Sequence, residues 1–369
     1  MEQSCKKFHQ EWHATLVCAA SVFPMKVGLA EIAERAGVSI STVSRVLNDK
    51  PGVNERTRRA VHTALDVLGY DAPGRITPRA VGLVGLVIPE LENPFFPRIA
   101  QLIEGGFAGT GYSPVLCSQS FEGPSEDEYV PILLEHGVAG IIFVSGMHAI
   151  AGIDADRYQP LVDRRLPLVC VNGYLPGLPA GFVANDDHVG MDLAIAHLTN
   201  MGHSRIGIAV GQMRYTPVLR KLSGFAAAMR RYVDADLSDE ALADVTRSTT
   251  FTVEGGALAA SHLLDRGVTA IVCASDVMAL GAIRAVRQRG LRVPEDVSVI
   301  GADDSHLNEF TNPPLTTLRQ PAAGIARAAV GSLMDQIRGE APAAGELLLQ
   351  PELVVRGSTA RAPELQRPS

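Results

Sequence analysis

Residues 27–48 read VGLAEIAERAGVSISTVSRVLN and predict two short amphipathic helices joined by a tight turn. Apolar residues of the first segment recur at i, i+3, i+4 and i+7 and therefore form one face: Leu29, Ile32, Ala33 and Ala36. Gly37 is suited to end this helix, because glycine adopts a positive φ without strain. Ser39 is a suitable N-cap for the second helix, whose apolar face consists of Val43, Val46 and Leu47.

The second helix has a polar face that suits the major groove of DNA. It carries hydroxyl groups and one arginine but no acid, so it can approach phosphates and base edges. The expected DNA contacts in this stretch are Ser39, Ile40, Ser41, Thr42, Ser44, Arg45 and Asn48. We expect Arg45 to contact a base, with Ile40 and Ser41 setting the base preference near the helix start. An ordinary helical hairpin is the alternative interpretation.

The same stretch resembles the headpiece of the lactose-repressor/galactose-repressor (LacI/GalR) family of transcription regulators. The resemblance rests on Ala33, on residues 36–39 and 42–48, and on the later Leu68-Gly69-Tyr70. A third helix is expected between Asn54, as its N-cap, and Gly69. Gly28 departs from the family, which usually has a hydroxyl residue there. The resemblance implies a helix-turn-helix headpiece that binds a pseudo-palindromic operator in double-stranded DNA as a homodimer.

Charge is distributed unevenly along the 369 residues. The formal net charge is −7, yet residues 26–79 hold nine Lys and Arg against six Asp and Glu. A basic headpiece on an acidic body orients itself on the phosphate backbone and limits contact elsewhere. We expect a disordered or mis-started extension over residues 1–25, the headpiece over 26–70 and a linker over 71–80. The body is expected over 81–358, and a disordered tail over 359–369.

The body alternates strand and helix signals. Short runs rich in Val and Ile predict strands at 81–88, 139–145, 167–172, 206–210, 270–274 and 297–300. Helical stretches are expected near 96–109, 189–201, 219–232, 253–264, 277–289 and 322–338. This alternation predicts an α/β body of two doubly wound lobes with parallel sheets. The resemblance adds a likeness to periplasmic sugar-binding proteins, with three crossovers between the lobes near 173–181, 304–317 and 340–346.

Ligands of doubly wound lobes bind beyond the carboxyl ends of the strands. Carried over residue by residue, the resemblance implies a small-molecule effector, most simply a sugar, bound between the lobes by Asn93, Phe95, Ser145, Asn172, Lys221, Phe251, Ser275, Asp303 and Gln320. Their amides, hydroxyls and charges can bracket sugar hydroxyls, while the two phenyl rings offer flat apolar faces.

Three of these positions depart from the family. Lys221 stands where Arg is frequent, with the adjacent Arg220 as an alternative, and Ser275 stands where Asn is frequent. Asn172 occupies a position that is an acid in some sugar-sensing members. By contrast, Asp187 and Asp276 open helices and are interpreted as N-terminal caps.

The linker is unusual for the family. Residues 71–79 read DAPGRITPR and contain Pro73, Gly74 and Pro78, which disfavour a helix. The family's hinge helix and its Leu wedge into the minor groove are therefore not expected here. Arg75 and Arg79 are expected to lie along phosphates or in a narrow minor groove.

The sequence carries no motif for catalysis or for a cofactor. It lacks a P-loop, a Gly-x-Ser-x-Gly elbow and a His-Glu-x-x-His pair, so we expect neither an enzyme nor a bound metal. The five cysteines are scattered and fit buried thiols in the cytoplasm, and no apolar run is long enough to span a membrane. Two alternatives to an effector-responsive repressor stay open: a sugar-binding protein with a vestigial headpiece, and a regulator whose partner is another protein.

Overall fold

The structure is a computed structural model that describes residues 28–47, 50, 52–68, 81–119 and 123–364. The chain forms two compact units, Met1–Pro78 and Arg79–Ser369, each described below by itself. In the described residues, no helix is both long and apolar enough to cross a lipid bilayer.

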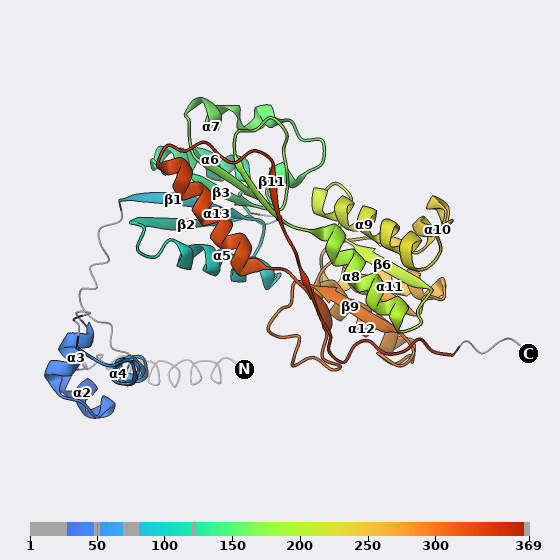
Figure 1. Cartoon of the computed structure of the whole chain (residues 1–369), viewed down its shortest axis with the longest axis horizontal. Helices are drawn as coiled ribbons and strands as arrows, with labels where there is room; N and C mark the ends of the chain where they lie inside the picture. Colours follow the sequence, from blue (N-terminus) through green and yellow to red (C-terminus); the bar gives the residue numbers. More distant parts are fainter. Residues whose placement is uncertain (1–27, 48–49, 51, 69–80, 120–122, 365–369) are drawn as a thin grey trace, which may run out of the picture. The chain divides into compact units, whose positions relative to one another are not determined.

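The first unit contains the headpiece, built from α2 (Leu29–Ala36), α3 (Ile40–Leu47) and α4 (Glu55–Leu68) (Figure 1). Gly37 ends α2 with a φ of 64°, as expected for a left-handed C-cap. The hydroxyl of Ser39 accepts a hydrogen bond from the amide of Thr42 at 3.2 Å, and Asn54 Oδ1 accepts one from Thr57 at 2.8 Å. Both N-cap predictions are confirmed. The small core consists of Ile32, Ala33, Val43, Val46, Val61, Ala64 and Leu65.

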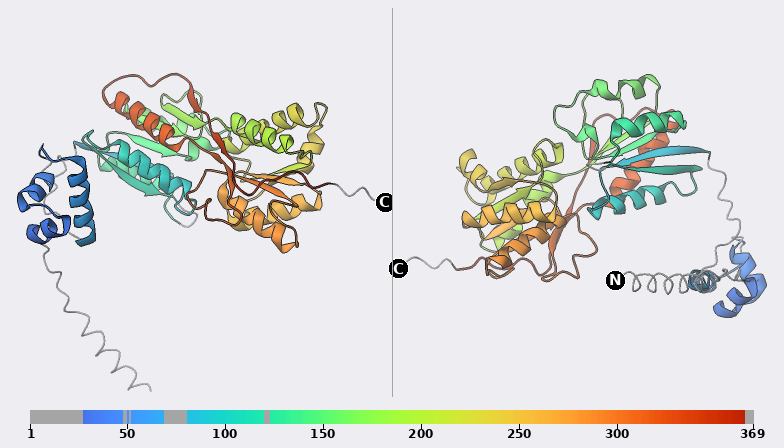
Figure 2. Two further views of the ribbon diagram at one scale, coloured as in Figure 1. Left: turned by 60° about the horizontal axis from the view of Figure 1, so that its bottom comes forward. Right: turned by 180° about the vertical axis from the view of Figure 1, so that it is seen from behind.

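The second unit is the body, which consists of two lobes with one six-stranded sheet each. The sheet of lobe 1 is parallel throughout, in the order β11-β5-β4-β3-β1-β2. Its strands are β1 (Gly82–Ile88), β2 (Tyr112–Ser118), β3 (Ile141–Val144), β4 (Leu168–Val171), β5 (Gly181–Asn185) and β11 (Glu346–Leu349). Helices α5 (Phe95–Gly106) and α13 (Ala322–Ile337) run side by side on one face (Figures 1 and 2). Helices α6 (Glu126–Glu135) and α7 (Gln159–Asp163) pack on the other.

Lobe 2 has the sheet order β12-β10-β9-β8-β6-β7, in which only β12 runs antiparallel to its neighbour. Its strands are β6 (Ile206–Val210), β7 (Thr246–Ser248), β8 (Ala270–Cys273), β9 (Ser298–Ala302), β10 (Thr316–Arg319) and β12 (Glu352–Val354). The helices around it are α8 (Asp187–Asn200), α9 (Thr216–Tyr232), α10 (Asp239–Asp244), α11 (Val253–Asp265) and α12 (Asp276–Gln288). The predicted class, a helical headpiece followed in the chain by two doubly wound parallel lobes, is confirmed.

The chain crosses between the lobes at three places that differ from those predicted. It passes from β5 to α8, from β10 to α13 and from β11 to β12, at residues 185–187, 319–322 and 349–352. The expected crossovers at 173–181, 304–317 and 340–346 are wrong, because each of these segments lies within a single lobe. Leu175 and Leu178, for example, are buried in the core of lobe 1, and Leu315 is buried in that of lobe 2.

The C-terminal segment is ordered further than predicted. His203 Nε2 lies 3.0 Å from the carbonyl oxygen of Ala360, and the amide of Ala360 donates to Ser298 Oγ at 3.0 Å. The amide of Ala362 donates to the carbonyl of Met201 at 2.9 Å. These bonds fasten residues 358–362 to lobe 2, so a disordered tail beginning at residue 359 is wrong. Cys117, Cys170 and Cys273 are buried free thiols, as predicted.

Candidate functional site

The exposed face of α3 carries the predicted DNA-contacting side chains of the headpiece. Ser39, Ile40, Ser41 and Arg45 are exposed, and Thr42 and Ser44 are half-buried. The hydroxyl of Ser39 lies 2.8 Å from those of both Ser41 and Thr42, so the helix begins with a cluster of three hydroxyls. Ile40 is 52% exposed beside this cluster. A large apolar side chain in this position can contact the methyl group of thymine.

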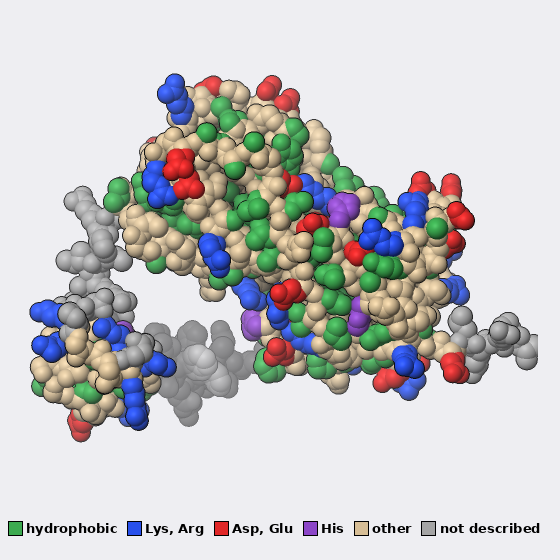
Figure 3. Space-filling view, in the orientation of Figure 1, with side chains coloured by type: hydrophobic (Ala, Val, Ile, Leu, Met, Phe, Trp, Pro, Cys, Tyr) green, Lys and Arg blue, Asp and Glu red, His purple; other side chains and the backbone are tan. Residues whose placement is uncertain are grey.

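Basic side chains surround the headpiece in the view of Figure 3, where few acidic groups are visible. Such an excess of Lys and Arg attracts the phosphate backbone. Asn48, Arg75 and Arg79 lie outside the described residues, as does the whole linker over 71–79. Their expected contacts with DNA and the expected absence of a hinge helix therefore stay predictions.

In the body, most of the nine predicted effector residues follow the carboxyl end of a strand. Ser145 follows β3, Asn172 follows β4, Asp303 follows β9 and Gln320 follows β10, while Asn93 lies in the loop from β1 to α5. Parallel sheets gather such residues at one edge. Lys221 comes from α9, one turn and a half into that helix.

Three of these strand-end residues have an unusual backbone. Ser145, Asn172 and Asp303 have φ values of 48°, 68° and 112°, in a region that non-glycine residues seldom adopt. Each such conformation costs on the order of 1–3 kcal/mol and persists only where the surrounding structure imposes it. Strain of this kind concentrates at binding sites. Residues singled out by a family resemblance thus also stand out by backbone geometry.

Asp303 joins the two lobes. Asn93 Nδ2 of lobe 1 donates to its Oδ2 at 3.4 Å, and Gln320 Nε2 donates to its Oδ1 at 2.6 Å. Burial raises the pKa of Asp303 well above its usual value, and the neighbouring Asp276 carboxylate raises it further. The amide donors and the charge of Lys221 oppose this rise. A carboxyl group keeps acceptor positions in either protonation state, so Asp303 can also bind hydroxyl groups of a ligand.

Lys221 forms a buried ion pair that the sequence did not predict. Its Nζ lies 2.6 Å from Asp187 Oδ1, and the two side chains are only 11% and 6% exposed. Asn185 Nδ2 donates to the same carboxylate oxygen at 3.0 Å, whereas the buried Asn185 Oδ1 has no partner within the described residues. The N-cap of α8 is Asp186, so interpreting Asp187 as that cap was wrong by one residue. Asn185 and Asp187 thereby join the candidate site.

Ser145 and Asn172 form a second pair, within lobe 1. Asn172 Nδ2 donates to Ser145 Oγ at 3.1 Å, across the ends of the neighbouring strands β3 and β4. Both side chains are half-buried and therefore keep polar atoms within reach of a ligand.

Three sequence-based assignments need correction. Phe95 is 5% exposed and lies in the core of lobe 1, with its ring edge-on to Phe96, so it offers no free flat face. The hydroxyl of Ser275 accepts from the amide of Met278 and caps α12, in the place expected of Asp276. Arg220 makes a bidentate ion pair with Glu346 at 2.9 and 2.7 Å and is therefore not available in place of Lys221. Phe251 is half-buried over Gly211, and its contact with an effector stays a prediction.

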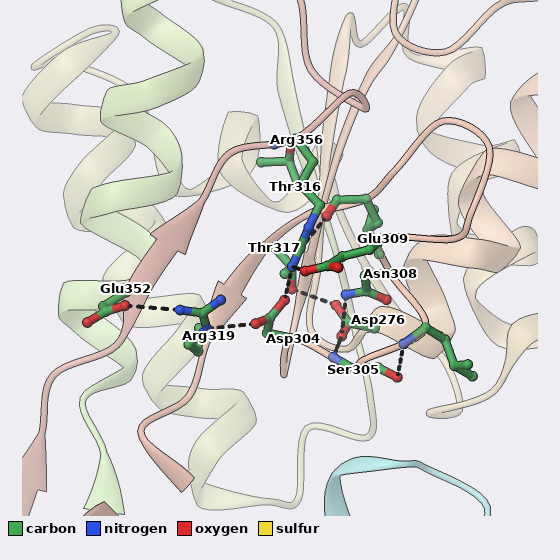
Figure 4. Close-up of polar contacts among 12 residues, drawn as sticks. Asp276, Asp304, Ser305, Asn308, Glu309, Thr316, Thr317, Arg319, Glu352 and Arg356 are labelled. Carbon is green, nitrogen blue, oxygen red and sulfur yellow. Dashed lines mark hydrogen bonds and ion pairs between the residues drawn. The ribbon is translucent and has the colours of Figure 1, made fainter. Parts of the chain in front are cut away.

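Asp276 and Asp304 organise a polar network in lobe 2 (Figure 4). The carboxylate of Asp276 accepts from Ser305 N, Asn308 Nδ2 and Thr317 Oγ1 at 2.8, 2.8 and 2.6 Å. Burial raises its pKa to about 6. These three bonds to protein groups give Asp276 a structural role, as its position at a helix start suggested.

Asp304 is paired with two arginines. Arg319 Nε lies 2.6 Å from its Oδ2, and Arg356 Nη2 lies 2.8 Å from its Oδ1. Burial alone would raise the pKa of Asp304, but these two guanidinium groups outweigh it and hold that pKa below its usual value. The carboxylate therefore stays ionised near neutral pH.

Further contacts close the space between the lobes. The amide of Ala151 in lobe 1 donates to the carbonyl of Arg214 in lobe 2 at 2.7 Å, and Ile150 and Tyr215 form an isolated antiparallel bridge. In addition, Arg98 Nη1 from α5 donates to the carbonyl of Asp304 in lobe 2 at 3.2 Å. The two lobes thus contact each other at more than one place.

Comparison with known proteins places the chain among bacterial regulators. The model of bacterial regulatory proteins of the lacI family matches residues 28–72, and that of the periplasmic binding protein-like domain matches residues 195–359. The HTH-type transcriptional regulator reg1 of Streptomyces lividans is 51% identical over 339 residues, which cover 92% of this chain and 98% of that protein.

Solved structures give the same result. The transcriptional regulator CelR in complex with cellobiose is 31% identical, with a TM-score of 0.65, over 90% of this chain and 99% of that one. The lac repressor dimer, bound to operator and the anti-inducer ONPF, is 27% identical, with a TM-score of 0.62, over 90% of this chain and 99% of that one.

Proposed function

The chain belongs to the lacI family of bacterial regulatory proteins, and from this premise we propose that it is a repressor whose affinity for its operator changes when a sugar binds between the two lobes of the body. Its family and its helix-turn-helix headpiece make it a DNA-binding transcriptional regulator. What the proposal adds is the class of effector, the residues that hold it and the sign of regulation.

Recognition of DNA is assigned to α3. Its exposed start, with the hydroxyls of Ser39 and Ser41 beside Ile40, suits base edges, and Arg45 suits a guanine. Because the lac repressor binds its operator as a dimer, we propose that this chain also acts as a homodimer on a pseudo-palindromic operator. Two half-sites would then lie about one helical turn apart. Because bacterial operators lie in the cytoplasm, we expect the protein to act there.

Recognition of the effector is assigned to the polar residues of the interlobe site, which we define as Asn93, Ser145, Asn172, Asn185, Asp187, Lys221, Asp303 and Gln320. Amides, a hydroxyl and ionised groups that converge from two lobes suit a ligand with many hydroxyl groups. The relative CelR is described in complex with cellobiose, which supports a sugar as the ligand class. No cofactor is needed for this role.

The single observation that carries the proposal is the contact of Asp303 with Asn93 and Gln320. It places a buried carboxylate in strained backbone geometry at the junction of both lobes. A ligand hydroxyl that binds this carboxylate competes with, or adds to, a bond that joins the lobes. Ligand binding and the arrangement of the lobes are therefore coupled, as an allosteric regulator requires.

The experiment combines DNA and sugar titrations on the full chain. Fragments of the DNA upstream of its own gene are tested by gel shift, and cellobiose, ribose and glucose are then added at a fixed salt concentration. We expect one fragment to be retained at nanomolar protein and one sugar to change that affinity between about fivefold and 150-fold. Sugar binding without any DNA shift would contradict the proposal and favour the sugar-binding alternative. DNA binding that no sugar changes would favour a protein-partnered regulator.

A further inference from the structure

The start of α5 reaches across to lobe 2 through two side chains. Asn93 contacts the carboxylate of Asp303, and Arg98 contacts the backbone carbonyl of the next residue, Asp304. We propose that Arg98 is a positioning residue for the interlobe site, because it holds the Asp303–Asp304 turn of lobe 2 from the opposite lobe. This inference deepens the proposed function and rests on it for the role of Asp303.

The turn that Arg98 contacts needs support, because two consecutive residues adopt positive φ values there. Asp303 has a φ of 112° and Asp304 has one of 57°. Neither residue is a glycine, so both conformations are strained and must be imposed by contacts. The amide of Asp303 donates to Leu318 at 2.9 Å, and that of Ser305 donates to Asp276 at 2.8 Å. Arg98 adds a charged donor to the carbonyl between them.

The side chain of Asp304 is fixed from within lobe 2. Figure 4 shows its carboxylate between Arg319 and Arg356, and Arg319 continues to Glu352 on β12. A side chain held by two guanidinium groups leaves its residue little freedom to rotate. If Arg98 displaces the Asp304 carbonyl, Asp303 therefore moves with it, because the fixed Asp304 side chain prevents the loop from compensating.

Arg98 lies in the first helix of the body that follows the headpiece in the chain. Strand β1, which ends at Ile88, follows the linker from the headpiece and leads through one short loop into α5. Asn93 and Arg98 flank the first turn of that helix. A change in how the interlobe site binds Asp303 therefore reaches the first elements of the body after the headpiece through two contacts at once.

The test uses amide hydrogen exchange on the full chain, compared among the wild type, Arg98→Met, Arg98→Lys and the control Gln101→Ala, which changes an exposed side chain of the same helix. Arg98→Met keeps the aliphatic stem but removes the donors. We expect peptides that cover residues 303–306 to exchange about fivefold faster in Arg98→Met, the factor for one hydrogen bond of ordinary net strength. Arg98→Lys should recover part of this protection, and Gln101→Ala should match the wild type.

A merely structural role of Arg98 would raise exchange within α5 alone. Unchanged exchange at 303–306 in Arg98→Met, or an increase confined to residues 95–106, would overturn the proposal. If Arg98→Met does not fold, Arg98→Lys tests the proposal. Amides of residues 303–306 should then exchange at least twofold faster than in the wild type, because lysine lacks the planar guanidinium group.

Sugar titrations separate this inference from the function on which it rests. With a sugar that binds the wild type, Arg98→Met should weaken binding about fivefold. If cellobiose, ribose and glucose all fail to bind the wild type, the proposed effector class fails, while the exchange result still decides the role of Arg98.

Discussion

Replacing Lys221 by Met removes one half of a buried ion pair within the interlobe site. Its Nζ lies 2.6 Å from Asp187 Oδ1, with side-chain exposures of 11% and 6%. Loss of one partner of such a pair costs about 3–5 kcal/mol, because the other charge stays buried without compensation. Asn185 still donates to the carboxylate at 3.0 Å. We therefore expect Lys221→Met to lower the free energy of unfolding by about 3 kcal/mol, at the low end of that range.

The double variant Lys221→Met/Asp187→Asn separates the charge effect from packing. Removing both charges at similar volume is often close to neutral, so it should recover more than half of the loss. Arg231→Met is the matched control, since Arg231 pairs with Asp192 at 2.8 Å but the two side chains are 66% and 36% exposed. That exposed pair is screened by water and should contribute far less to stability than the buried pair.

Urea unfolding followed by circular dichroism at neutral pH measures the wild type, Lys221→Met, Asp187→Asn, the double variant and Arg231→Met, with the free energy taken from midpoint and slope. A loss for Lys221→Met no larger than that for Arg231→Met would refute the reasoning. So would a double variant whose loss equals the sum of the single ones, because two groups that interact must show a coupling energy.

Four further outcomes are expected. Arg45→Ala should weaken operator binding by about 1–3 kcal/mol at fixed salt, measured by gel shift, if this side chain contacts a base. Asp303→Asn should weaken sugar binding by about 1–3 kcal/mol in calorimetry while leaving operator binding intact; normal sugar binding would remove Asp303 from the site. His148 is buried, and burial lowers its pKa to about 4, below the ordinary 6.5. As the pH falls, the unfolded chain therefore takes up the proton first, so the free energy of unfolding should decrease by up to about 3 kcal/mol from pH 6.5 to pH 4. Urea unfolding of His148→Gln should lack this decrease. On operator DNA the linker over 71–79 should stay non-helical and the DNA should bend little; a protected helix there by amide exchange, or a sharp central kink, would contradict this.

The sequence allowed the family, the fold class and the long elements to be predicted, and these predictions are confirmed. Residues 27–48 were sufficient for the headpiece, because capping residues and apolar spacing are local signals. The six predicted strands and six predicted helices of the body all exist, with ends displaced by a few residues. Their apolar runs are long enough to be recognised without knowledge of their neighbours.

The elements at the crossovers could not be predicted in this way. Strand β5 (Gly181–Asn185) pairs with β11 (Glu346–Leu349), far along the chain, and both are short. Strands β10 and β12 are equally short and pair antiparallel. Such segments become strands because a partner lies beside them. Because these short strands were not predicted, the three crossovers were placed within loops rather than at strand ends.

The candidate site shows the same limit. The family resemblance led to Ser145, Asn172 and Asp303, which follow strand ends and whose backbone geometry supports the choice. It could not show that Phe95 faces the core or that Lys221 is paired with Asp187, because both depend on which side of a helix meets which neighbour. Arg98 gave no signal at all, since its partner is a backbone carbonyl 206 residues away.

The threading of the chain through both lobes has a consequence for its synthesis on the ribosome. Helix α13 supplies Ile325, Ala326, Ala329, Val330 and Leu333 to the core of lobe 1, yet it is translated after nearly all of lobe 2. Until residue 337 has left the exit tunnel, the face of the lobe 1 sheet that α5 and α13 share is covered by α5 alone. Lobe 2 in turn lacks β12 until residue 354 emerges. Neither lobe can therefore complete its fold during elongation, and the two mature together only when the chain is almost finished.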